Sequence, residues 1–140
     1  MPAPADDLDD AMSQPVPDGA SEQMRMLRRQ GNRCRLTIRE LSDATVIPEF
    51  AMDQYGSRYL HTSLDSASDE DTNIVFMKLL PQAAELTTDV FGNFVLQKLL
   101  EIGSVEVKRV FAEQLVGDVL RLSLHAYLAF MSFAFARSRQ

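Results

Sequence analysis

Asn93, Phe94 and Gln97 are the residues of this chain whose types and spacing are best suited to chemistry. On a helix, Asn93 and Gln97 would lie one turn apart on the same side, with Phe94 beside them. Amide groups can hydrogen-bond to the edge of an unpaired base, and an aromatic ring can stack on its face. Stacking of one base contributes about 1–3 kcal/mol, which would explain an aromatic residue on the polar side of a helix.

The same arrangement occurs earlier in the chain. "DQYGSRYLHTSLD" begins at Asp53, and "DVFGNFVLQKLLE" begins 36 residues later at Asp89. In the earlier copy the flat side chain is the guanidinium of Arg58, which also stacks on bases. One exposed phenylalanine needs no explanation, but its repetition in register with a second planar group favours a binding face. The candidate binding residues are Ser57, Arg58, His61, Asn93, Phe94 and Gln97.

Helices are predicted to position these residues. In both copies a helical wheel places large apolar residues on one half and the candidate residues on the other. "SDEDTNIVFMKLL" and "SVEVKRVFAEQLV" each open with a capping serine and an early acid, and Pro81 ends the first of them. No long stretch alternates with period two, as a strand would. The sequence therefore predicts an all-α solenoid in which each repeat packs on its neighbours.

A third copy is expected 36 residues further on, and there the pattern fails. "LRLSLHAYLAFMSFAFA" has Leu128 at the position of the glycine, and from His125 onward the motif is lost. We therefore expect a truncated or aberrantly spliced product with a divergent apolar tail over residues 125–140. An uncovered terminal repeat predicts an exposed apolar patch and self-association through that tail. Apolar residues occupy the positions of the candidate binding residues in this copy and form the patch: Ala129, Phe130, Phe133 and Phe135.

Charge divides the chain into further segments. The net charge is −6, and residues 1–23 hold six acids and no lysine or arginine. That acidic tail is poor in large apolar residues, which predicts disorder. Residues 24–48 are a basic helical lead-in and partial capping repeat, for which Ser21 is a candidate N-cap. Residues 49–124 form the repeats.

Other classes of function lack support. His61 and His125 lie far apart without a cysteine cluster, so no metal site is expected. No phosphate-binding loop or nucleophile motif is present, and we expect neither an enzyme nor a cofactor. The apolar stretch 122–136 is shorter than the roughly 20 residues of a membrane helix, and the N-terminus lacks a signal peptide. A soluble cytoplasmic protein that does not contact a membrane is predicted.

"DQYGSRYLH" and "DVFGNFVLQK" resemble the base-reading helices of Pumilio repeats, whose spacing the 36-residue period fits. "NRCRLTIRELSDATVIPEFAMDQYGSRYL" is similar to the partial capping repeat of that family followed by its first full repeat. The resemblance covers about residues 30–124. It implies a right-handed α-solenoid of three-helix repeats whose concave side binds single-stranded RNA, one base per repeat.

Carried over by position, the resemblance assigns a role to each candidate residue. Arg58 and Phe94 become stackers, and the polar residues on either side of them become edge readers. The Asn93 and Gln97 pair implies recognition of uracil. A serine and glutamine pair would imply adenine, but His61 stands in place of the glutamine and leaves the first base open.

Members of the family bind the 3′ untranslated regions of messenger RNA and control translation or decay, recruiting regulatory proteins on their convex face. With two reading helices this chain is expected to bind RNA weakly. The rival hypothesis is a helical scaffold that binds proteins and not RNA, which Asp65 and Glu101 beside the reading face favour. A third alternative is a gene product without function.

Overall fold

The computed structural model describes residues 8–42, 45–118, 130–132, 134 and 135, and the part it describes contains helices and no strand. The N-terminal layer holds two short 3-10 helices and two α-helices: η1 (Leu8–Ser13), α1 (Glu22–Gln30), η2 (Gly31–Arg33) and α2 (Ile38–Leu41). The elements that follow are α3 (Val46–Ala51), α4 (Gln54–Asp65), α5 (Asp69–Leu79), η3 (Leu80–Gln82), α6 (Ala83–Thr88), α7 (Gly92–Ile102) and α8 (Val105–Asp118).

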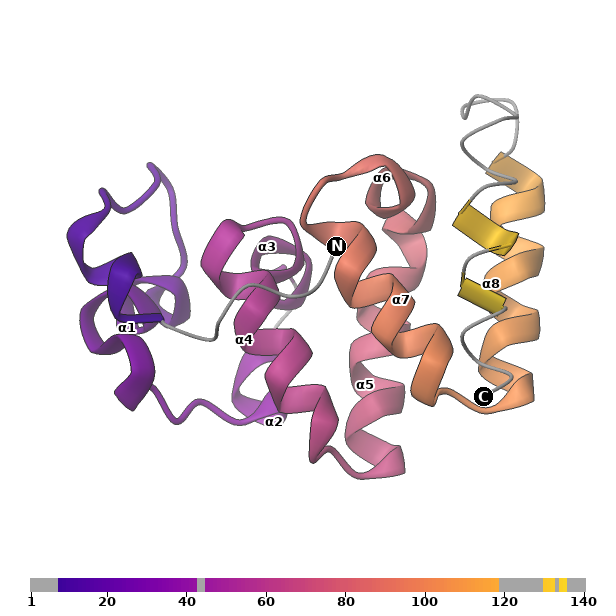
Figure 1. The fold of residues 1–140 in the computed structure, drawn as a ribbon, viewed down its shortest axis with the longest axis horizontal. Coiled ribbons are helices and arrows are strands. Elements are labelled where there is room, and N and C mark those ends of the chain that lie inside the picture. Colours follow the sequence, from indigo (N-terminus) through magenta and orange to yellow (C-terminus); the bar gives the residue numbers. More distant parts are fainter. Residues whose placement is uncertain (1–7, 43–44, 119–129, 133, 136–140) are drawn as a thin grey trace.

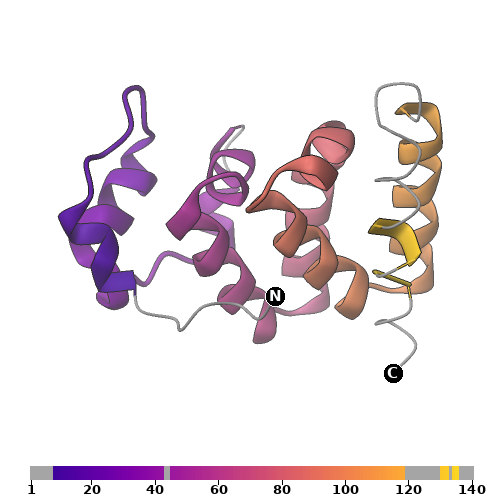
Figure 2. The same ribbon diagram turned by 45° about the horizontal axis from the view of Figure 1, so that its top comes forward.

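Two successive units of three α-helices form the body of the molecule. The first consists of α3, α4 and α5, and the second of α6, α7 and α8 (Figure 1). The units follow one another along the long axis, with α4 and α7 in one layer and α5 behind them (Figures 1 and 2). The predicted all-α solenoid is confirmed, and each sequence repeat corresponds to one unit.

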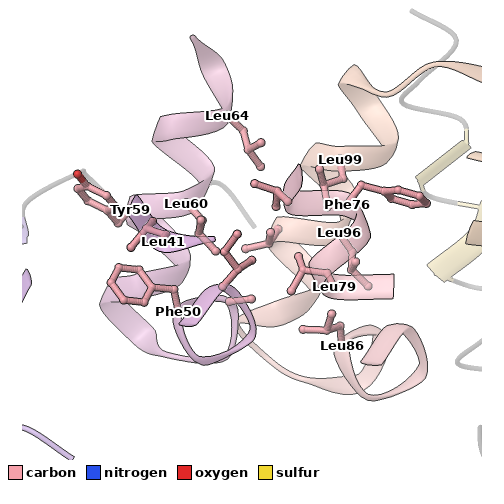
Figure 3. Packing of buried hydrophobic residues seen from close by; sticks show 14 of the residues in the cluster. Leu41, Phe50, Tyr59, Leu60, Leu64, Phe76, Leu79, Leu86, Leu96 and Leu99 are labelled. Carbon is pink, nitrogen blue, oxygen red and sulfur yellow. The ribbon is translucent and has the colours of Figure 1, made fainter. Parts of the chain in front are cut away.

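The core lies between these layers. Leu60 and Leu64 of α4 and Leu96 and Leu99 of α7 are buried and point into the space between the two units (Figure 3). These residues belong to the apolar halves of the helical wheels, so the helical period decides which side of α4 and of α7, the two predicted reading helices, faces its neighbours. Phe50 of α3 adds an edge-to-face contact with Tyr59, with the two ring centroids 6.2 Å apart.

An aspartate lies at the entry to both predicted reading helices, as the N-cap residue of α4 and three residues before the first residue of α7. Asp53 accepts hydrogen bonds from the backbone N–H groups of Tyr55 and Gly56 at 2.9 and 2.8 Å. Asp89 does the same for Phe91 and Gly92 at 3.0 and 2.7 Å. The carboxylates satisfy N–H groups that the first turn of a helix leaves unpaired. The repeated aspartate therefore has a local structural reason.

The predicted role of Ser21 as an N-cap is confirmed. Its hydroxyl oxygen accepts a hydrogen bond from the N–H of Met24 at 3.0 Å, at the start of α1. The segment before it differs from expectation. Disorder is predicted over residues 1–23, yet residues 8–13 form η1, whose Leu8 and Ala11 are buried. η1 packs against α1, η2 and α4. Two apolar side chains among acids suffice here because neighbouring elements provide a surface against which they are buried.

The predicted C-terminal patch is wrong at Phe130, which is only 9% exposed and belongs to the hydrophobic core together with Ala134. Phe135 is half-buried. The described part of the tail runs beside α8 (Figures 1 and 2). A segment that has lost the motif still covers the last helix, because burial needs only apolar side chains. Residues 119–129 and 133, including Leu128, Ala129 and Phe133, lie outside the described residues.

Within the described ranges, no helix is long and apolar enough to cross a membrane.

The environment of Tyr59 predicts that the folded protein loses stability at alkaline pH. Its buried hydroxyl donates to the backbone carbonyl of Leu36 at 2.7 Å, and burial, followed by the neighbouring Cys34 thiol, raises the pKa of Tyr59. The phenol of the unfolded chain titrates near pH 10, so the folded state loses stability as the pH rises above about 10. Urea unfolding at about pH 8 and about pH 11 should show this loss, and Tyr59→Phe should reduce it. An unchanged pH dependence in Tyr59→Phe would contradict the assignment.

Candidate nucleic-acid interface

The two predicted reading helices, α4 and α7, carry the candidate residues and are neighbours in the fold. α4 and α7 pack against each other and lie side by side in Figures 1 and 2. The ammonium group of Lys98 on α7 forms an ion pair with the carboxylate of Asp65 on α4. The Lys98 side chain is 12% exposed and that of Asp65 is 57% exposed, so the ammonium group is sheltered while the carboxylate remains open to water. The ion pair links the two helices beside the candidate residues.

In the second repeat, the two amides are hydrogen-bonded in series. The Asn93 amide donates to the backbone carbonyl of Asp89 at 3.0 Å, and the Gln97 amide donates to the side-chain oxygen of Asn93 at 2.7 Å. These bonds hold both side chains in place and leave the Gln97 carbonyl oxygen and the second N–H of each amide for a ligand. Phe94 is half-buried beside them. The arrangement offers one acceptor, donors and a ring surface.

In the first repeat, the serine is less accessible than expected. Ser57 is 5% exposed, and its hydroxyl donates to the backbone carbonyl of Gln54 at 3.2 Å. His61 and Arg58 are half-buried. The Arg58 guanidinium carbon lies 5.5 Å from the centroid of the Tyr55 ring, within the range of a cation–π contact. The accessible groups of this repeat are therefore the imidazole and the guanidinium.

A buried charge lies beside the start of α4. The guanidinium of Arg28 on α1 pairs with the carboxylate of Asp53 at 2.6 Å, and it also donates to the carbonyl of Pro15 at 3.1 Å. The same guanidinium lies 4.9 Å from the centroid of the Tyr55 ring. Sequence reasoning did not find this cluster. Nothing in the arginine-rich stretch of α1 distinguishes Arg28 from its exposed neighbours except its helical register with the buried Met24 and Leu27.

In the third copy, the residue in register with Arg58 and Phe94 is Phe130, and it is buried. Its neighbours at the reading positions lie outside the described residues. The structure therefore brings together the helices that carry the candidate residues of two repeats, and among the described residues of the third copy it shows no accessible stacking side chain. Among the described residues, no group of histidine, cysteine, aspartate and glutamate side chains could hold a metal ion.

Comparison with known proteins agrees with these units. Residues 47–80 and 82–115 each match the Pumilio-family RNA binding repeat. Pumilio homolog 1 of Xenopus laevis is 40% identical over 125 residues, which are 89% of this chain and 10% of that protein. The mRNA-binding protein puf3 of Schizosaccharomyces pombe is 37% identical over 71 residues, 50% of this chain and 10% of that protein. The chain thus spans about a tenth of the length of these relatives.

Proposed function

We propose that this chain, which belongs to the Pumilio family of RNA-binding repeat proteins, binds single-stranded RNA across the common face of α4 and α7. The observation that carries the proposal is the second repeat, where two ordered amides lie beside Phe94. The first repeat supplies the Arg58 guanidinium on the adjacent helix. Each repeat then holds one unpaired base by its edge and by its face.

For the second repeat we propose uracil. The free Gln97 carbonyl oxygen is an acceptor for the N–H of uracil, and the remaining N–H groups of Asn93 and Gln97 are donors for a uracil carbonyl. Phe94 stacks on the ring. A cytosine presents an amino group and an unprotonated ring nitrogen on the same edge, so it would place a donor against donors and an acceptor against an acceptor. We therefore expect uridine to be favoured at this position.

The biological ligand we propose is messenger RNA in the cytoplasm, contacted in its 3′ untranslated region, with control of translation or decay as the outcome. Two bases give weak binding and little sequence discrimination. Of the two acids beside the face, Asp65 is a lesser obstacle than the sequence suggests, because Lys98 compensates its charge. We further propose that regulatory proteins bind on the convex face, on the side of α5.

The test is a titration of labelled uridine-rich single-stranded RNA into the full chain at low salt, where phosphate contacts are least screened. The double variant Asn93→Ala, Phe94→Ala should lose about tenfold to several hundredfold in affinity, the equivalent of one stacked base and its edge contact. The matched control is Asn73→Ala, Met77→Ala, which removes an exposed amide and an exposed apolar side chain from α5.

Equal binding by both double variants would place the RNA elsewhere. Circular dichroism checks that all three proteins are helical. If the folded parent chain does not bind RNA at all, the proposal fails and the helical scaffold for protein partners becomes the better hypothesis.

A further inference from the structure

We propose that Tyr55 is a positioning residue of the first repeat, which holds the Arg58 guanidinium ready to stack on a base, and that Arg28 fixes Tyr55 in turn. This inference rests on the proposed RNA binding, and it adds two residues that act through Arg58 without contacting the RNA. Tyr55 itself is 4% exposed and does not reach the ligand.

The geometry is a short chain of contacts from the core to the surface. Arg28 is buried, and its charge is compensated by Asp53 at 2.6 Å. Its guanidinium carbon lies 4.9 Å from the Tyr55 ring centroid, and that of Arg58 lies 5.5 Å from the same centroid. Arg58 is half-buried, and no ion pair to it is found in the part of the chain that the structure describes. Tyr55 is thus its main anchor, and its charge remains available to RNA.

An arginine needs such an anchor more than an aromatic stacker does. Its side chain has several rotatable bonds and loses their freedom when it stacks on a base. A contact that already restrains the guanidinium in the free protein removes part of that cost from binding. Asp53 matters here because two uncompensated guanidinium groups near one ring would repel each other.

The second repeat provides the internal comparison. Its stacker, Phe94, is a rigid ring with few rotamers, and the residue in register with Tyr55 is the half-buried Phe91. No cation is found over Phe91 among the described residues. Within the described part of the chain, both cation–π contacts lie in the repeat whose stacker is an arginine. This pattern is expected if they serve to hold that arginine.

The first test needs no RNA. In the NMR spectrum of the full chain, ring currents from Tyr55 should displace the side-chain Nε–Hε signal of Arg58 from the position of a free arginine. Tyr55→Phe keeps the ring and should keep the displacement, whereas Tyr55→Leu should abolish it. An Arg58 signal at the free-arginine position in the parent chain would overturn the inference, even if Tyr55→Leu did not fold.

The second test separates stacking from general stability. Tyr55→Leu should lower affinity for uridine-rich RNA several-fold, should have no effect in an Arg58→Ala background, and should have no effect on an RNA of equal length without bases. Phe91→Leu, the matched control, should act equally with and without Arg58. An equal loss for Tyr55→Leu in both backgrounds would overturn the positioning role. If the parent chain binds neither RNA, the proposed function and the stacking role both fail, while the NMR result still decides whether Tyr55 holds Arg58.

Discussion

Asp53→Ala should destabilise the fold by about 3–5 kcal/mol, whereas Asp89→Ala should cost about 0.5–2 kcal/mol. Each aspartate accepts two backbone N–H groups at the start of a reading helix, and the distances nearly match. The cap is therefore lost in both variants. Asp53 also pairs with a buried arginine, and Asp89 has no such partner among the described residues. Its removal leaves the Arg28 charge uncompensated in the interior, which is the larger cost.

Urea unfolding followed by circular dichroism measures both free energies under the same conditions. The double variant Arg28→Met, Asp53→Ala should be less destabilised than Asp53→Ala. It replaces the unpaired buried guanidinium of Arg28 with an apolar side chain. Equal destabilisation by Asp53→Ala and Asp89→Ala would show that the ion pair contributes nothing beyond the cap.

Gly56→Ala should destabilise the chain by about 1–3 kcal/mol or more, whereas Gly117→Ala should stabilise it by up to about 1 kcal/mol. A methyl group on Gly56 would lie 2.6 Å from the carbonyl oxygen of Phe50 and 2.7 Å from its α-carbon. These are backbone atoms of α3, so relief requires moving that helix away from α4. A methyl group on Gly117 would meet no atom of the described residues within 4 Å, so the expected effect is the gain in helix propensity.

Thermal unfolding of the two glycine variants gives the comparison directly. Gly92→Ala should fall between them, because its methyl group would meet a movable side-chain carbon of Leu86 at 2.6 Å. A Gly56→Ala variant as stable as the parent would show that α3 and α4 can separate at no cost. That result would remove the reason for a glycine at this point of the repeat.

The N-terminal layer contacts the residues that position the candidate site of the first repeat. α1 supplies Arg28, which pairs with the aspartate that begins α4 and contacts the ring beneath Arg58. Shortening the chain through α1 should therefore alter the first reading helix while leaving Asn93, Phe94 and Gln97 unchanged. The second repeat depends instead on its own amide series and on the Lys98 ion pair to α4.

The sequence alone determined the helical class, the repeat and the side of each helix that carries the candidate residues. The reason is local, since helical period, capping side chains and the spacing of Asp53 and Asp89 act within a few turns. The same local rules predicted Ser21 as a cap and Pro81 as the end of a helix. They could place Phe94 beside Asn93 and Gln97 without knowledge of any contact between helices.

Only the tertiary structure decided which residues are accessible and which charges are paired. Ser57 and Phe130 occupy reading positions by register, yet both are buried. Arg28 looks like its exposed neighbours in the sequence but pairs with Asp53, 25 residues away, and Lys98 pairs with Asp65 on the preceding unit. Burial and pairing depend on segments that are distant along the chain and meet only when the layers stack. The local sequence pattern carries no information about contacts between distant segments. It therefore predicted which side of each helix carries the candidate residues, but not which residues pack against that side or bury it.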